Sequence, residues 1–284
     1  MELQIISYNI LADYLNSSDY ILVNKKYLDN DYRNKLLLKK LKKVITNKTI
    51  ICLQEVGPTQ LSSLYTFFTN NKFNCISIKD LVIFYPNNCK IIFTETNYIN
   101  SLAKKYLKKD KLIDNVNKFN QAFIILQLQI NNKKIYICNT HLVSNPKFNN
   151  TIKVLQSYLL AKRLEKYNKV ILCGDFNSTP NSNPYKLLST GIIKYPYYND
   201  LKIKNNFSSS YSLLYGSDIN ITTHTTNITT PIFTDTIDYI WITNNITPIK
   251  SNIICKKNEL NKKNFLPNKN EPSDHYMLIV LLKI

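Results

Sequence analysis

A short apolar run that gives way abruptly to polar residues, VILCGDFNSTP at 170–180, limits the fold more than any other part of the chain. Its first four residues predict a strand that is buried on both faces. Gly174 allows the backbone to pass close to another group, and Asp175 and Asn177 follow where the strand ends. A carboxylate and an amide there suit a metal ion or a phosphate, but both residue types also form turns. This stretch alone leaves the two interpretations open.

The same change from apolar to polar residues occurs at the other predicted strands. Acidic, amide or imidazole side chains follow, precede or interrupt five further apolar runs: Asn9 after 3–7, Gln54 and Glu55 after 50–53, Asn139 and His141 after 135–138, Asp238 within 237–242, and Asp274 and His275 before 277–282. Turn chemistry alone would not repeat this pattern at six strands, and α/β sheets build their sites at strand ends. The sequence therefore predicts one site assembled from several strands.

Apolar periodicity predicts the elements between these strands. We expect helices over 32–45 with Asp31 as the cap, from Pro58 onward, over 150–166 and near 184–188. Strands at 76–78, 82–85 and 91–93 are interpreted as a meander, and Asn131-Asn132 as the turn of a hairpin. Residues 100–120 lack a clear period and predict a long loop, and 202–234 predict an ordered loop over the site. The chain, 1–284, is expected to form one domain.

The formal net charge of +18 favours a polyanionic partner such as nucleic acid. Only Arg33 and Arg163 are arginines, however, and the many lysines accompany many Asn, Ile and Tyr residues. Codon bias in an AT-rich genome also produces this mixture. The charge is therefore moderate evidence for such a substrate and says little about where it binds.

The cysteines indicate a reducing compartment. None of the six has C-x-x-C spacing, and Cys52, Cys138 and Cys173 lie within apolar strands. No apolar run approaches the roughly 20 residues of a membrane span, and the first strand leaves no room for a presequence. We therefore expect a cytoplasmic protein with no membrane partner.

Seven motifs, in this order, resemble the endonuclease/exonuclease/phosphatase superfamily: SYNILADYL (7–15), DYR (31–33), ICLQEV (51–56), NTHL (139–142), GDFNSTP (174–180), IDYIW (237–241) and PSDH (272–275). Their combination is similar to the branch of the deadenylases, Nocturnin, Angel and the 2′-phosphodiesterase, and most similar to the last. The resemblance implies an α/β fold, a four-layer sandwich in which two mixed β-sheets pack face to face with helices outside.

The resemblance also implies a Mg²⁺-dependent exoribonuclease for adenylate-rich RNA, as a poly(A) deadenylase, a 2′-5′-oligoadenylate phosphodiesterase or both. It implies these ligands for one or two Mg²⁺ ions, which Mn²⁺ can replace: Glu55 as the principal ligand, with Asn9, Asp175, Asn177 and Asp274. Asp175 would in addition orient or deprotonate water. His141 and His275 would hold the scissile phosphate, and Asp238 would fix the tautomer of His275.

An adenine pocket follows from the same resemblance. In the deadenylase branch it consists of a proline five residues after the NTHL histidine, a phenylalanine five before the IDY aspartate, and the GDFN asparagine; here these are Pro146, Phe233 and Asn177. Phe233 could instead belong to the core, but its Thr- and Pro-rich surroundings favour base stacking. His224 matches no motif and is interpreted as structural.

Some features keep other functions open. Ser144 stands near a position where the deadenylases often have tryptophan, and Asp235 replaces a glycine before the IDY motif, so the shape of the cleft can differ. The chain has no leucine-rich repeats for docking into a larger deadenylase complex, which predicts a free-standing catalytic domain. The alternatives are a Nocturnin-like 2′-phosphatase for a dinucleotide and a catalytically inactive nucleic-acid-binding module.

Overall fold

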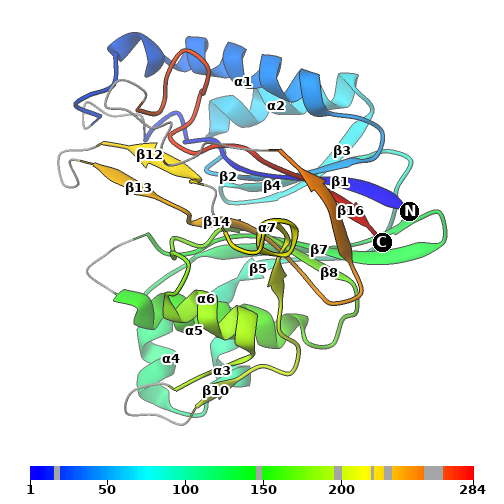
Figure 1. Cartoon of the computed structure of the whole chain (residues 1–284), viewed down its shortest axis with the longest axis vertical. Helices are drawn as coiled ribbons and strands as arrows, with labels where there is room; N and C mark the ends of the chain where they lie inside the picture. Colours follow the sequence, from blue (N-terminus) through cyan, green and yellow to red (C-terminus); the bar gives the residue numbers. More distant parts are fainter. Residues whose placement is uncertain (16–19, 145–148, 195–199, 219–220, 227–231, 253–264) are drawn as a thin grey trace.

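The computed structural model describes residues 1–15, 20–144, 149–194, 200–218, 221–226, 232–252 and 265–284. Two six-stranded mixed sheets form its two inner layers, and helices cover their outer faces (Figure 1). The first sheet has the order β15 (Thr247–Ser251), β16 (Leu278–Lys283), β1 (Glu2–Asn9), β2 (Thr49–Gln54), β4 (Leu81–Pro86), β3 (Phe73–Ile78). The second has the order β11 (Ser208–Ser209), β14 (Asp238–Ile242), β8 (Val170–Asp175), β7 (Lys133–His141), β6 (Ala122–Ile130), β5 (Lys90–Tyr98). The expected four-layer α/β sandwich is confirmed.

Each sheet contains one parallel pair at its centre, β1 with β2 and β7 with β8, and antiparallel pairs on both sides. The residues of β2 and β8 are buried along their whole length, as their unbroken apolar runs predict. Because parallel strands end at the same edge of a sheet, the polar residues that follow each pair come together there.

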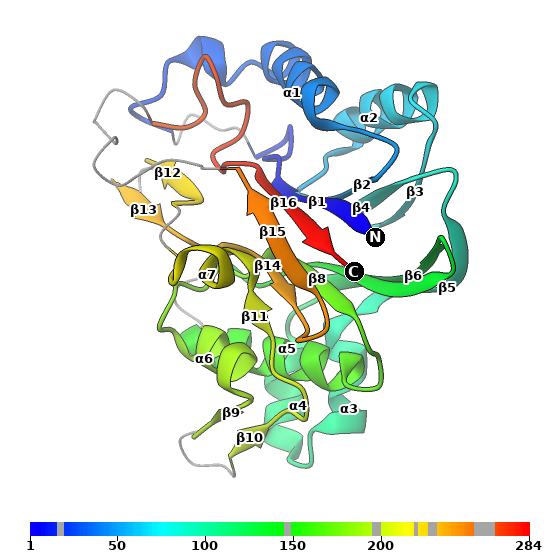
Figure 2. The same cartoon turned by 45° about the vertical axis from the view of Figure 1, so that its right-hand side comes forward.

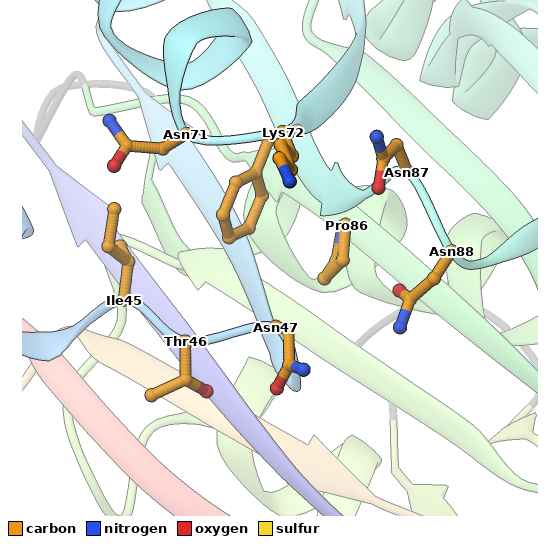
Figure 3. Close-up of a pocket in the computed structure, with 9 residues that line it drawn as sticks. Ile45, Thr46, Asn47, Asn71, Lys72, Pro86, Asn87 and Asn88 are labelled. Carbon is orange, nitrogen blue, oxygen red and sulfur yellow. The ribbon is translucent and has the colours of Figure 1, made fainter.

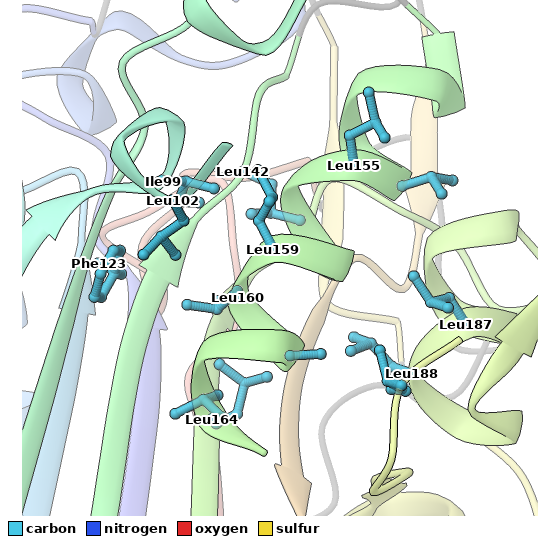
Figure 4. Packing of buried hydrophobic residues seen from close by; sticks show 14 of the residues in the cluster. Ile99, Leu102, Phe123, Leu142, Leu155, Leu159, Leu160, Leu164, Leu187 and Leu188 are labelled. Atoms are coloured by element: carbon cyan, nitrogen blue, oxygen red, sulfur yellow. The ribbon is translucent and has the colours of Figure 1, made fainter. Parts of the chain in front are cut away.

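Three buried apolar clusters join the layers. One lies between the two sheets and includes Ile50 and Ile171. Another lies between the first sheet and helices α1 (Asn30–Val44) and α2 (Pro58–Asn70). The third lies between the second sheet and helices α4 (Asp110–Asn117), α5 (Asn149–Leu164) and α6 (Asn183–Thr190). Figure 4 shows that α5 contributes leucines to this third cluster along much of its length. The central strands are thus held from both faces.

The first helix begins earlier than expected. Asp29, and not Asp31, caps α1: its side chain accepts a 2.8 Å hydrogen bond from the Tyr32 N–H, and its backbone is extended. Asp31 lies in the first turn, where its charge still complements the helix dipole. Either aspartate could have served as a cap, and the expected choice of Asp31 was wrong because only Asp29 has the extended backbone of a cap.

Residues 100–120 are not the expected long loop. They contain most of a short 3₁₀ helix, η2 (Ile99–Leu102), and the helices α3 (Ala103–Tyr106) and α4. Leu112 and Val116, four residues apart on α4, are buried in the cluster beside α5. With Ile113, α4 has only three apolar residues in eight, too short a stretch to establish a recognisable period, and the helix was therefore not predicted.

The expected meander is also wrong in part. The strands β3 and β4 form a hairpin in the first sheet, but β5 crosses to the second sheet and pairs with β6 over its whole length. A strand pattern predicts that a segment is extended and does not identify its neighbour. The hairpin at Asn131-Asn132 is confirmed, since it joins β6 to β7 with both residues at positive φ (47° and 62°).

The polar residues 202–234 contain more structure than the expected loop. Within the described part lie β11, helix α7 (Ser210–Tyr215) and a hairpin of β12 (Thr223–Thr225) and β13 (Phe233–Asp235). Small elements elsewhere are η1 (Lys25–Tyr27), β9 (Ile192–Ile193) and β10 (Leu201–Lys202). No helix among the described residues combines the length and apolar character needed to cross a membrane.

Candidate active site

The ends of β1, β2, β7 and β8 meet at one edge that the two sheets share. In the strand registers Asn9 lies opposite Gln54, and His141 lies opposite Asp175. The antiparallel β14 begins at this edge, with Asp238 opposite Asp175. Both chain termini lie at the other edge, where β1 begins and β16 ends (Figure 2). The predicted convergence of polar strand ends is therefore present in the structure.

A tight approach of β8 to β7 explains Gly174. Its φ is +154°, and a Cβ added there would lie 2.1 Å from the carbonyl oxygen of Thr140, so no side chain fits. Asp175 follows, and its Oδ1 accepts a 2.8 Å hydrogen bond from the N–H of Asn177, which has a left-handed backbone. This local turn aims a carboxylate and an amide at the same edge.

The carboxylates of Glu55 and Asp175 share one donor. Asn9 Nδ2 donates to Glu55 Oε1 at 2.8 Å and to Asp175 Oδ2 at 3.1 Å, while Asn9 Oδ1 accepts the N–H of Leu11 at 3.0 Å. Asn9 therefore turns its donor group, and not its oxygen, toward the acids. In this geometry Asn9 orients both carboxylates, and its expected role as a metal ligand stays a prediction. Burial raises the pKa of Glu55, with the charge on His141 opposing the shift.

Two histidines face Asp175 from opposite sides of the sandwich. Its Oδ2 lies 3.6 Å from His141 Nε2 and 3.7 Å from His275 Nε2. Asn177 Nδ2 lies 3.1 Å from His141 Nε2 and also donates to the carbonyl oxygen of Leu142 at 3.0 Å. Because the Leu142 carbonyl fixes the amide of Asn177, this amide in turn holds the imidazole of His141 in place.

The expected pairing of Asp238 with His275 is confirmed by the geometry. Asp238 Oδ2 accepts a 2.8 Å hydrogen bond from His275 Nδ1, and both side chains are buried. Burial raises the pKa of Asp238 to about 6, with His275 opposing the shift. Burial also disfavours a charged His275, but Asp238, Asp274 and Asp175 together hold its pKa well above the usual range. Since the Asp238 oxygen engages Nδ1, Nε2 of His275 is the nitrogen that faces Asp175.

One oxygen or nitrogen atom from each of Glu55, His141 and Asp175 lies within 4.8 Å of the others, a spacing that can hold a metal ion. Asp175, Asp238 and His275 form a second such group. Among the described residues Asp274 belongs to neither group. It accepts a 2.8 Å hydrogen bond from the Tyr20 hydroxyl and lies 4.0 Å from His275 Nε2.

The residues of the expected adenine pocket are only partly placed. Phe233 is half-buried in β13, where it pairs with Thr225, and Asn177 lies beside His141. Pro146 lies outside the described residues. His224 is buried in β12, bonds Thr234 Oγ1 through Nδ1 at 2.7 Å and stacks on Phe265, in agreement with the expected structural role.

Sequence reasoning assigned no role to a buried polar bridge beneath the site. Gln54 Nε2 donates to Asn139 Oδ1 at 2.7 Å, and Asn139 Nδ2 donates to the backbone carbonyls of Leu53 and Val82 at 2.8 and 3.1 Å. The bridge joins β2 of the first sheet to β7 of the second. Both residues occur in the quoted motifs, but a strand pattern does not show that they face each other.

Arg33 was a second omission. Its guanidinium is buried and donates to the backbone carbonyls of Pro272, Ile10 and Leu11, so it ties the segment before Asp274 to the segment after Asn9. Its planar fork of donors serves several acceptors that a lysine ammonium serves poorly. An arginine kept in a chain with so many lysines was the signal that could have identified it.

Lys153 is the third omission. Its ammonium, on α5, donates to the carbonyl oxygen of Asn177, and burial lowers its pKa while Asp175 opposes the shift. This hydrogen bond stabilises the left-handed backbone of Asn177 in the GDFN motif. The helix was expected, but its polar side chains gave no indication of a partner.

The fold and this cluster define an α/β sandwich protein whose acidic and imidazole groups lie at an edge shared by both sheets. Residues 6–275 match the model of the Endonuclease/Exonuclease/phosphatase family, and the chain belongs to that family. It is 28% identical over 335 residues to the CCR4-Not complex 3′-5′-exoribonuclease subunit Ccr4 of Candida albicans, with 99% of this chain and 41% of that protein covered. It is 27% identical over 325 residues to 2′,5′-phosphodiesterase 12 of Homo sapiens, with 98% and 51% covered.

Solved structures show the same fold. The crystal structure of ANGEL2, a 2′,3′-cyclic phosphatase, in complex with adenosine-2′,3′-vanadate has a TM-score of 0.81 and 21% identity, and covers 99% of this chain and 95% of that one. The human Nocturnin catalytic domain with bound sulfate anion has a TM-score of 0.71 and 19% identity, and covers 99% and 94%. The chain spans about half or less of the length of the curated relatives named above.

Proposed function

We propose that this chain is a Mg²⁺-dependent phosphodiesterase that removes mononucleotides from the 3′ end of adenylate-rich RNA or of oligoadenylate. The observation that supports this most is the position of Asp175, whose Oδ2 lies 3.1 to 3.7 Å from nitrogens of Asn9, His141 and His275. Hydrolysis of a phosphodiester needs a group that accepts a proton from water and donors around the phosphate oxygens. The names of the two relatives, an exoribonuclease and a 2′,5′-phosphodiesterase, support the substrate class.

In this mechanism Asp175 orients the attacking water and accepts its proton. His275 donates from Nε2 to a non-bridging oxygen of the scissile phosphate, and His141 is the second residue proposed to hold that phosphate. Asp238 accepts the Nδ1 proton of His275 at 2.8 Å, which leaves the Nε2 proton directed at the substrate. Asn177 keeps His141 in place through the 3.1 Å contact with its Nε2. Each group therefore has a task that its position supports.

The donor set fits a hard divalent cation. Glu55 and Asp175 supply carboxylate oxygens, which Mg²⁺ prefers and Mn²⁺ also accepts, and the raised pKa of Glu55 reflects burial that a cation would offset. Asn9 orients both acids, and Asp274, beside His275, is the residue proposed for a second ion. When bound, Mg²⁺ neutralises charge on the phosphate and stabilises the leaving oxygen.

We also propose that 1–284 form one catalytic domain, that RNA or oligoadenylate is its partner, and that it works in the cytoplasm. Both sheets supply site residues, which supports one domain. The net charge of +18 supports a polyanionic partner. Five cysteines are free in the described part of the chain, and this supports a reducing compartment.

Digestion of labelled 3′-5′ and 2′-5′ oligoadenylates side by side tests the function. We expect Mg²⁺-dependent release of mononucleotide, loss of cleavage with a chelator, and recovery when Mg²⁺ is added back. Glu55→Gln should abolish cleavage, and the control Glu95→Gln, which breaks an ion pair with Arg163 away from the site, should not. No cleavage by the wild type, or equal cleavage by Glu55→Gln, refutes the proposal.

The same assay separates the alternatives. Release of phosphate from a 2′-phosphorylated dinucleotide, without mononucleotide from either oligoadenylate, would support the Nocturnin-like function. Binding of oligoadenylate without cleavage would support the inactive binding module.

A further inference from the structure

A small cavity adjoins the active site on the side of the turn between β3 and β4. Its volume is about 80 Å³, and its wall includes Lys79 and Asp80 of that turn, Gln121 before β6, and His141 and Ser144 at and after the end of β7. His141 thus belongs to both the cavity and the active site. The proposed chemistry gives no task to the other four residues.

The turn is fixed next to the catalytic carboxylates. The N–H of Val56 donates to the carbonyl oxygen of Asp80 at 2.9 Å, which joins the turn to the residue that follows Glu55. Lys79 Nζ lies 3.4 Å from Asn120 Oδ1, on the side of the cavity where Gln121 lies. Within the described part of the chain, no carboxylate forms an ion pair with Lys79. Its charge is therefore available to an anion from solution.

An exposed aromatic ring lies on the same side of the site. Tyr14 is 63% exposed, in a turn closed by a 3.0 Å hydrogen bond from the Leu15 N–H to the Ala12 carbonyl oxygen. The neighbouring Asp13 packs against the segment that follows Glu55, since a Cβ added to Gly57 would lie 2.0 Å from Asp13 Oδ1. Partial burial, and then the charges of Asp80 and Glu55, raise the pKa of the Tyr14 hydroxyl. No other ring among the described residues packs on it. An exposed ring beside a phosphodiester site suits base stacking.

We propose that this cavity is the subsite for the nucleotide on the 5′ side of the scissile bond, where Lys79 and Ser144 bind its 5′ phosphate and Tyr14 stacks on its base. The inference rests on the proposed phosphodiesterase function and specifies that single strands of three or more nucleotides gain a phosphate contact that a dinucleotide lacks. A cavity of about 80 Å³ admits a phosphate group but not a base. Because Asp80 adds negative charge to the wall, Lys79 decides whether the cavity attracts a phosphate.

Two substrates isolate the phosphate contact. A triadenylate has a phosphate on the 5′ side of its middle nucleotide, and a diadenylate with a free 5′ hydroxyl has only the scissile phosphate. Lys79→Met is compared with the control Lys72→Met. Both lysines flank β3 and both have a left-handed backbone (φ 55° and 64°), so the substitution meets the same backbone conformation. Lys72 lies at the other end of β3, beside a cavity of about 310 Å³ that is lined mostly by asparagines and other polar residues (Figure 3).

For Lys79→Met we expect kcat/KM for the triadenylate to fall about 3- to 5-fold, mainly through KM, as for a solvent-exposed ion contact. The slope of log(1/KM) against log salt should weaken by about 0.7 for this substrate, the value for one phosphate of a single strand. The diadenylate should be cleaved as by the wild type, and Lys72→Met should change neither substrate. Tyr14→Ala should lower kcat/KM for both substrates about 5- to 50-fold. Tyr14→Phe and the exposed control Tyr65→Ala should not.

Equal effects of Lys79→Met on both substrates, or no effect on either, overturn the inference. Fluorescence anisotropy with labelled triadenylate on the Glu55→Gln variant separates this failure from failure of the proposed function. If wild type cleaves but Lys79→Met binds and cleaves triadenylate normally, the subsite is wrong and the function stands. If wild type does not cleave but Lys79→Met still weakens binding of triadenylate by the same factor, the subsite stands and the function is wrong.

Discussion

Replacement of Asp238 by Asn tests a buried interaction of the site. The carboxylate accepts a 2.8 Å hydrogen bond from His275 Nδ1, and both side chains are shielded from water. Asparagine keeps the size of the side chain and removes its charge. The variant therefore isolates what the charge contributes to the protonation and orientation of His275.

The expected loss follows from the strength of this hydrogen bond. A hydrogen bond to a charged group contributes about 1.5–3 kcal/mol and a neutral one about 0.5–1.5 kcal/mol. Because the asparagine oxygen can still accept the Nδ1 proton, only this difference is lost, and kcat should fall about 5- to 15-fold. The pH profile should change as well. In the wild type the pKa of His275 lies well above its usual value, although burial opposes this, because Asp238 and two other aspartates face the ring. Asparagine removes the largest of the favourable charges, so the pKa of His275 should fall.

The direction in which the pH profile moves depends on which protonation state of His275 is active. If the protonated ring holds the phosphate, wild-type activity persists as pH rises until the raised pKa is passed, and the alkaline limb of the profile should move to lower pH in Asp238→Asn. The folding contribution has the same direction: it is fully present below the unfolded pKa of about 6.5 and is lost as pH rises through the folded value.

Release of mononucleotide from oligoadenylate, measured from about pH 5 to pH 9, checks this prediction. Asp218→Asn is the matched control: Asp218 is a partly buried acid whose pKa is also raised by burial, and it accepts hydrogen bonds from Tyr185 and Ser209 away from the site. It should lower stability and leave the pH profile unchanged. An Asp238→Asn enzyme with the kcat and alkaline limb of the wild type would refute the reasoning.

Three further predictions concern the base, the fold and the motif turn. Phe233→Ala should lower kcat/KM for oligoadenylate about 10- to 100-fold but far less for oligouridylate, because a pyrimidine stacks weakly; equal losses on both would show that the adenine pocket is misplaced. Arg33→Lys should lower the free energy of unfolding by about 2–4 kcal/mol in urea denaturation, because lysine cannot serve three buried carbonyls. Gly174→Ala should lower the free energy of unfolding by more than about 3 kcal/mol, since the added Cβ would clash with a backbone carbonyl of β7. A variant with the melting temperature of the wild type would contradict this.

The strands and the residues at their ends could be predicted from the sequence, because a strand buried on both faces is an unbroken apolar run that ends where the sheet meets solvent. The residues 170–173 and 50–53 are such runs and lie within β8 and β2. The short helices α3 and α4 could not be predicted in the same way. They are only four and eight residues long and bury one and two apolar residues, which is too little sequence to establish a period.

The sequence predicted which residues come together at the candidate site better than it predicted how their side chains are oriented. Glu55, His141 and Asp175 come together as expected, and so do Asp238 and His275. The orientation of groups within the site could not be predicted, since it depends on partners from distant segments. The amide of an asparagine can donate or accept, and only the Leu11 N–H decides that Asn9 donates to the two acids.

The way the two sheets pack explains why the arrangement of the site residues could not be predicted from the sequence. The interface between them is an apolar cluster along most of its length, and apolar packing has little directional preference. At the site several polar contacts cross from one sheet to the other, among them Asn9 to Asp175, Gln54 to Asn139, and His275 to Asp238. Because hydrogen bonds are directional, these contacts fix how the sheets lie on each other at that edge. A substitution that repacks the apolar interface should therefore disturb the distances around Asp175 before it unfolds the protein.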